Sequence, residues 1–120
     1  MDQSFPNHFA QEWINAWNSH NIAAIMSHYA DDIDFCSPLV AKLGFDPSGR
    51  INNKTTLQAY FTTGLSRFPD LHFDLHQVLS GVSSVVLYYT TIGGKKSAEF
   101  MQFNESGKVD KVVAHYSELA

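Results

Sequence analysis

Apolar residues in the first half of the chain recur at the spacing of α-helices. One apolar stripe falls within 9–17, a second follows Asn21, which can cap a short helix over 22–29, and a third lies within 57–68. The first stripe consists of Phe9, Ala10, Trp13, Ile14 and Trp17. Glycine and proline in 38–53 predict a long loop that forms a rim or lid. The first half is therefore expected to hold three helices, with one short strand over 33–36.

The second half is rich in β-branched and aromatic residues, which predicts strands. The predicted strands are 71–79, 85–91, 96–103 and 109–117. Gly93-Gly94 is typical of a two-residue hairpin loop, and a four-residue turn is expected after Phe103. Three helices followed by an antiparallel meander predict an α+β fold with helices over one sheet face.

The strand expected over 85–91 begins with five apolar residues, Val85 to Tyr89. A sheet with helices on one face and water on the other alternates apolar and polar side chains instead. We therefore expect the uncovered face of the sheet to meet a second copy of the chain, forming a homodimer.

Strand register follows from the two turns. A two-residue loop at Gly93-Gly94 sets Tyr88 opposite Glu99, and the four-residue turn sets Glu99 opposite Val112. The face expected under the helices then holds Val86, Tyr88, Thr90, Glu99, Met101, Phe103, Val112, Ala114 and Tyr116. The face expected to point away holds Ala98, Phe100, Gln102 and His115.

Glu99 stands out because it is a lone carboxylate among apolar neighbours, and burial of an unsatisfied charge is costly. One interpretation makes it a pocket acid whose pKa is raised by desolvation. A second makes it a structural residue that is hydrogen-bonded to Tyr88 or to a helix end. A third, in which the register is different, leaves it in solvent.

The chain has 120 residues, which suits one domain spanning 1–120, and 44% of them are hydrophobic. The formal net charge is −4 and no basic run is present, so we expect no nucleic-acid partner. No apolar run is long enough to span a membrane, and no export signal is evident. With Cys36 as the single cysteine, a cytoplasmic location is expected.

Metal and cofactor sites are not predicted. His72 and His76 are four residues apart, a spacing that suits zinc on a helix. Their segment alternates like a strand, however, where four residues span roughly 13 Å. The glycines match no phosphate-binding pattern. We therefore expect no metal and no cofactor.

Five segments of the chain carry a family resemblance. They are Trp13 to Asn18, Tyr29 to Phe35, Ser37-Pro38, Phe100 to Phe103, and Gly107 to Val109. In this order they resemble the nuclear transport factor 2-like superfamily, in particular its SnoaL-like and ketosteroid isomerase-like branch. The resemblance implies a cystatin-like cone, in which a curved sheet wraps around a long helix and encloses a deep apolar pocket. It also implies a homodimer through the outer sheet face.

The resemblance allows the isomerase's catalytic positions to be compared one by one. The base, an aspartate, is replaced by Ser37, and the oxyanion-binding tyrosine aligns with Trp13. The supporting tyrosine aligns with Phe61, and the second donor, a protonated aspartate, aligns with Glu99. Of these four positions only Glu99 keeps the same kind of side chain, a carboxylic acid. We therefore do not expect steroid isomerisation by the mechanism of the isomerase.

The sequence favours a cofactor-independent enzyme acting on a small apolar carbonyl or hydroxyl compound, by isomerisation, dehydration or cyclisation. Glu99 is the expected catalytic group. The residues expected to bind the substrate are Trp13, Ser37, Phe61, Tyr88, Met101 and Tyr116. The alternative is a non-catalytic ligand-binding or interaction dimer on the same fold.

Overall fold

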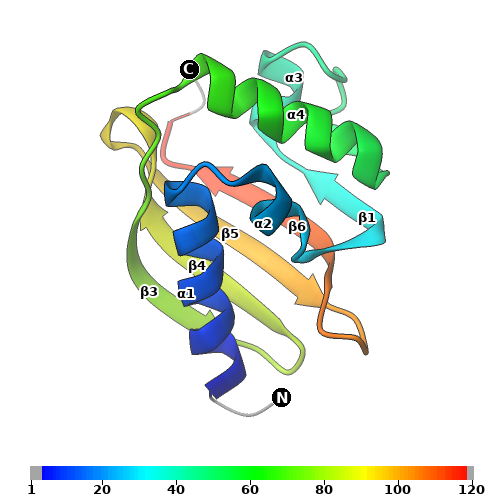
Figure 1. Ribbon diagram of the computed structural model, residues 1–120, viewed down its shortest axis with the longest axis vertical. Helices are drawn as coiled ribbons and strands as arrows, with labels where there is room; N and C mark the ends of the chain where they lie inside the picture. The colour runs from blue at the N-terminus through cyan, green and yellow to red at the C-terminus, as the bar shows by residue number, and fades with distance from the viewer. Residues whose placement is uncertain (1–3, 119–120) are drawn as a thin grey trace.

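The computed structural model describes residues 4–118 and confirms the α+β class (Figure 1). Its helices are α1 (Ser4–Asn18), α2 (Ile22–Met26), α3 (Pro38–Lys42) and α4 (Lys54–Arg67). Its strands are β1 (Tyr29–Cys36), β2 (Arg50–Ile51), β3 (Asp74–Ser80), β4 (Ser84–Thr90), β5 (Lys96–Phe103) and β6 (Val109–Tyr116). The two long helices and the four C-terminal strands lie where the residue pattern predicted them.

Local side-chain chemistry sets where the helices begin. Asn21 caps α2 as expected, because its side chain accepts a hydrogen bond from the Ala24 amide at 3.1 Å. Asn53 caps α4 in the same way, with its side-chain oxygen 2.7 Å from the Thr56 amide nitrogen. Helix α1 is stabilised by packing, because it buries an apolar stripe along one side.

All six strands form one sheet in the order β2-β1-β6-β5-β4-β3. The sheet is mostly antiparallel, and only β1 and β6 among the described strands run parallel. The sheet is curved, and α1 and α2 lie across its concave face while α4 lies at one end (Figure 1). The buried side chains of these layers form the core, which places any cavity between α1, α4 and the concave face.

The segment expected to be a long loop contains two further elements. Helix α3 forms there because the Ser37 side chain accepts a hydrogen bond from the Leu39 amide at 3.2 Å and Pro38 suits a first turn. The two residues of β2 pair with the end of β1. The second helix also ends earlier than expected, at Met26, because Tyr29 pairs with Val109 of β6.

The register predicted between β4 and β5 is wrong by one residue. The connection is a three-residue 3₁₀ turn, η1 (Ile92–Gly94), closed by a hydrogen bond from the Thr91 amide to the Lys95 carbonyl at 2.7 Å. Gly93 and Gly94 both have positive φ, of 69° and 76°, which allows this tight path. Glu99 therefore pairs with Leu87, whereas Tyr88 pairs with Ala98.

This shift exchanges the two faces of β4 and leaves those of β5 and β6 as predicted. The concave face receives Val85, Leu87 and Tyr89 in place of Val86, Tyr88 and Thr90. Glu99 faces Ala114 of β6 and not Val112, which is two residues away on the same face. Among residues 4–118, no helix combines the length and apolar character required to cross a membrane.

Candidate functional site

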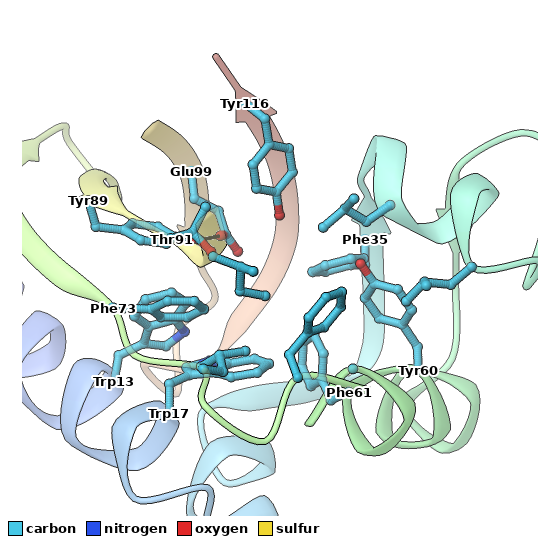
Figure 2. Close-up of a pocket in the computed structure, with 16 residues that line it drawn as sticks. Trp13, Trp17, Phe35, Tyr60, Phe61, Phe73, Tyr89, Thr91, Glu99 and Tyr116 are labelled. Atoms are coloured by element: carbon cyan, nitrogen blue, oxygen red, sulfur yellow. Dashed lines mark hydrogen bonds between the residues drawn. The ribbon is translucent and has the colours of Figure 1, made fainter. Parts of the chain in front are cut away.

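An aromatic cavity of about 70 Å³ lies between α1, α4 and the concave face of the sheet (Figure 2). Its aromatic walls are Trp13, Trp17, Phe35, Tyr60, Phe61, Phe68, Phe73, Tyr89 and Tyr116. The volume is roughly five times the 10–15 Å³ that one buried water needs, so the cavity admits a small chemical group. We refer to it as the aromatic cavity.

The aromatic walls hold one another in place through ring contacts. The rings of Trp13 and Phe73 are stacked, with centroids 5.7 Å apart and planes at 20°. Trp17 meets Phe61 edge to face at 4.8 Å. Such pairs add to the stabilisation that burial provides, so the walls are fixed before any ligand arrives.

Glu99 points into the aromatic cavity from β5 (Figure 2). The residue is only 5% exposed, and its Oε1 accepts a hydrogen bond of 2.6 Å from the Tyr89 hydroxyl. Burial raises the pKa of Glu99 from 4.5 to about 7, because the charged carboxylate loses its water, while the Tyr89 bond acts in the opposite direction. At neutral pH the carboxyl is therefore present in both its protonated and its ionised form.

Two tyrosine hydroxyls, those of Tyr60 and Tyr116, also point toward the hollow (Figure 2). Burial is the largest cause that raises the pKa of both, and the charge of Glu99 raises them further. Hydrogen bonding with the buried Ser37 acts in the opposite direction on both groups. Both tyrosines therefore remain neutral hydrogen-bond donors at any physiological pH.

The indole of Trp13 forms part of the wall, but its N–H is already engaged. Trp13 Nε1 donates to the hydroxyl of Tyr29 across 3.0 Å. Burial also raises the pKa of Tyr29, so that hydroxyl remains a neutral partner. Trp13 therefore contributes apolar ring surface to the cavity wall, while its N–H bonds to Tyr29.

The structure brings together part of the predicted set of site residues. Trp13, Phe61 and Tyr116 line the aromatic cavity with Glu99. Ser37 and Met101 are buried and lie outside the described lining, Ser37 as the cap of α3 and Met101 as part of the core.

The placement of Tyr88 beside Glu99 is wrong, because the three-residue turn directs Tyr88 to the other face. Tyr88 is 37% exposed there, and its ring lies 5.6 Å from that of His76. Tyr89, the next residue, takes the place expected for Tyr88 beside the carboxyl.

Sequence reasoning missed several lining residues, among them Tyr60, Phe73 and Tyr89. Tyr60 precedes Phe61 on α4, and both are buried. Two adjacent aromatic residues widen the apolar stripe of this helix, and that width was the signal in the sequence that could have indicated Tyr60. Tyr89 could have been found only from the correct turn length.

Comparison with protein families identifies the whole fold. The family model described as a SnoaL-like domain matches residues 10–116, which is nearly the full chain. The chain belongs to the SnoaL-like family. This confirms the family resemblance.

Solved structures agree with the SnoaL-like assignment. A SnoaL-like protein of unknown function from Burkholderia thailandensis is 39% identical, with a TM-score of 0.93 and 98% of each chain covered. A Kribbella flavida protein provisionally named a ketosteroid isomerase is 15% identical, with a TM-score of 0.73, covering 96% of this chain and 79% of that one.

The IdmH protein of Streptomyces antibioticus, provisionally named a polyketide cyclase, is 13% identical, with a TM-score of 0.77. The match covers 93% of this chain and 91% of IdmH. At these low identities the last two relatives support the SnoaL-like fold and not a reaction. No curated protein matches the chain in sequence.

Proposed function

We propose that this SnoaL-like protein binds a small apolar carbonyl or hydroxyl compound in the aromatic cavity and that Glu99 exchanges a proton with it. The observation that carries the proposal is a buried carboxyl, bonded to Tyr89 at 2.6 Å, that lines an otherwise aromatic hollow. An acid–base group works best when its pKa is near the working pH, and that of Glu99 is about 7.

The groups around Glu99 support proton transfer next to a carbonyl. Ionised Glu99 removes a proton from the carbon beside the carbonyl; the electron pair of that C–H bond forms a new C=C bond, and the π pair of the C=O bond moves onto the oxygen to give an enolate. Tyr60 and Tyr116 donate hydrogen bonds to the oxygen as its charge develops. The protonated Glu99 then returns its proton to a second carbon, which completes an isomerisation, or to a leaving hydroxyl, which completes a dehydration.

A test of this proposal does not need the natural substrate. Small cyclic enones and aryl ketones are incubated with the protein in D₂O, and NMR follows deuterium entering the carbon beside the carbonyl. We expect the wild type to exchange at least one compound faster than buffer does, and Glu99→Gln to lose most of this acceleration. Glu105→Gln, in an exposed turn, is the matched control and should exchange like the wild type.

Equal exchange by the wild type and Glu99→Gln would remove the catalytic role of Glu99. Exchange is also measured from pH 5 to 9, where a base of pKa about 7 gives a rate that rises and then levels. Native mass spectrometry of the purified protein, which detects a retained small molecule, would indicate the natural ligand class.

A non-catalytic ligand-binding protein is the second candidate. It is favoured by the position that holds the base in the isomerase, which is Ser37 here and is occupied in capping α3. Glu99 is also the one carboxylate among the described residues that line the cavity. Binding of the enones and ketones without any exchange above buffer would support this candidate.

We also propose that two copies of the chain pair through the outer face of the sheet. Apolar side chains remain partly exposed there, including Leu79 at 48% and Tyr88 at 37%. The neighbouring Phe100 and Val113 continue this apolar face across β5 and β6.

Size-exclusion chromatography with light scattering tests the pairing at micromolar concentration. We expect the wild type to run as a dimer and Tyr88→Lys as a monomer. Val82→Lys, in an exposed turn, should remain a dimer. A monomeric wild type would contradict the proposal.

A further inference from the structure

Gly64 interrupts the apolar face of α4 where this helix borders the aromatic cavity. One face of the helix, continued by the residue that caps its end, carries Leu57, Phe61, Gly64 and Phe68, at spacings of four, three and four residues. Leu57 and Phe61 are buried on this face. Phe61, Gly64 and Phe68 all line the aromatic cavity. Gly64 therefore leaves a gap in the cavity wall between two aromatic rings.

The usual structural reasons for a glycine do not apply at Gly64. The residue lies inside α4, and it is not among the described glycines with positive φ. A Cβ placed on Gly64 would meet no described atom within 4 Å beyond its own stretch of helix, so no neighbouring element approaches too closely for a side chain. A glycine inside a helix is less stable than an alanine, because it has more conformational freedom to lose on folding. Gly64 thus weakens α4 without a local gain in packing.

The empty space at Gly64 belongs to the aromatic cavity. A Cβ at position 64 would point to the same side of α4 as those of Leu57 and Phe61, which are packed in the core. Side chains on such a face ordinarily touch their neighbours at 3.4–4 Å, as expected for a close-packed interior. Because Gly64 lines the cavity and meets nothing at this range, a methyl group there would take part of the volume of about 70 Å³.

Gly64 also lies where the cavity wall passes from the interior to the surface. Phe61 is 4% exposed, whereas Phe68 is 37% exposed. Phe68 lines both the aromatic cavity and a neighbouring hollow of about 220 Å³, and the two hollows also share Leu39 and Tyr116. The room left at Gly64 therefore extends the aromatic cavity along α4 toward its more exposed end. A ligand confined to the space beside Phe61 would not use this room.

We propose that Gly64 determines the size of the ligand, because an apolar part longer than one six-membered ring lies against the backbone of α4 in the space that a side chain at position 64 would occupy. The inference rests on the proposed function, because it takes the aromatic cavity as the ligand site. It narrows the ligand class to carbonyl or hydroxyl compounds whose flat apolar part is longer than a single ring. A local departure from helix-forming sequence is then explained by the site, as is common where function and stability compete.

The test compares two aryl ketones that differ by one fused ring, acetophenone and 2-acetonaphthone. Calorimetry measures their affinities for the wild type, for Gly64→Ala and for Gly64→Leu. We expect the wild type to bind 2-acetonaphthone more tightly than acetophenone. Gly64→Ala should weaken binding of 2-acetonaphthone about tenfold and Gly64→Leu should abolish it, because the added carbons take its room. The affinity of Gly64→Ala for acetophenone should change less than about twofold, since a single ring leaves position 64 free.

Thermal unfolding of the unliganded proteins separates loss of room from loss of structure. Gly64→Ala should raise the Tm by about 2–5 °C, because alanine is the better helix former, so this variant binds less while it is more stable. Thr62→Ala is the matched control, since Thr62 is an exposed residue of α4 outside the described cavity lining. It should raise the Tm in the same direction and leave both affinities unchanged. If Gly64→Leu does not fold, Gly64→Ala alone carries the test.

Each outcome bears on one proposal or on both. Equal wild-type affinities for the two ketones, an unchanged affinity of Gly64→Ala for 2-acetonaphthone, or an equal loss for both ketones would overturn the size inference alone. Failure of both ketones to bind the wild type would overturn the ligand site and the inference together. A loss confined to 2-acetonaphthone, with no effect of Glu99→Gln on deuterium exchange, would support the inference and remove only the catalytic role.

Discussion

The two faces of the sheet use the same kinds of side chain for different purposes. On the concave face, Tyr89 is 2% exposed and donates to a buried carboxyl, whereas its neighbour Tyr88 on the outer face is 37% exposed. Helices close the concave face but leave a hollow with an acid in it, whereas the outer face carries partly exposed apolar side chains. Adjacent residues of one strand therefore face the proposed reaction site on one side and a proposed contact between chains on the other.

Shortening a side chain of β4 should lower the unfolding free energy much more on the concave face than on the outer face, and this is the largest difference expected between the two faces. Leu87, fully buried on the concave face, should lose about 3–4 kcal/mol of unfolding free energy when changed to Ala, since a cavity remains in a packed core. Val86→Ala, on the outer face, should cost less than about 1 kcal/mol. Chemical denaturation at several protein concentrations measures both values, because pairing of chains would add a concentration-dependent part. Similar losses at both positions would mean that the faces of β4 are assigned wrongly.

The buried acid should make the stability of the concave face depend on pH. The pKa of Glu99 is about 7 in the folded chain and 4.5 when unperturbed, so between these values the folded state holds one more proton than the unfolded state. The contribution of Glu99 to the unfolding free energy therefore falls as pH rises from about 4.5 to 7 and is level outside that range.

Glu99→Gln removes this fall. The variant should be more stable than the wild type by about 2–3 kcal/mol at pH 8, with little difference at pH 4. Urea denaturation of both proteins across this pH range measures the difference. A constant difference at all pH values would show that the carboxyl titrates as it does in water.

Removing the hydroxyl of Tyr89 should lower stability more than removing that of Tyr88, although by a smaller amount than the changes above. Tyr89→Phe leaves a buried carboxyl without its hydrogen bond and should cost about 1–2 kcal/mol, and it should also raise the pKa of Glu99 further. Tyr88→Phe, on the outer face, should change stability by less than about 0.5 kcal/mol. Thermal unfolding of the two variants in parallel measures both effects. If Tyr88→Phe lowered stability as much as Tyr89→Phe, the assignment of Tyr89 and not Tyr88 as the hydrogen-bond donor to Glu99 would be wrong.

Elements with many residues were predictable from the sequence because periodicity accumulates along them. Helices α1 and α4 and strands β3 to β6 each repeat their pattern over seven or more residues. Helix α3 has five residues and β2 has two, so neither develops a period. Gly93 and Gly94 suit both a two-residue and a three-residue turn, and a change of one residue in turn length reverses every side chain of the strand before it.

The site residues were likewise predictable only where they lie on elements long enough to show a residue pattern. Glu99 and Tyr116 were placed on the concave face correctly because the turn between β5 and β6 preserved their alternation. Trp13 and Phe61 came from the family resemblance. Ser37 was expected to bind the substrate, but its role in starting α3 depends on a helix that the residue pattern did not indicate. Tyr60 required knowing how α4 is rotated against the sheet, which is decided by packing in three dimensions.

The parallel pairing of β1 with β6 has a consequence for how the molecule forms. Tyr29 of β1 pairs with Val109 of β6, so contacts that join the sheet span some eighty residues of sequence. Such distant partners make folding slow, since a long stretch of chain must be ordered before they meet. During synthesis β1 and β2 emerge early and wait for β6, and a ribosome stalled before residue 109 would hold two unpaired strand edges that are open to aggregation.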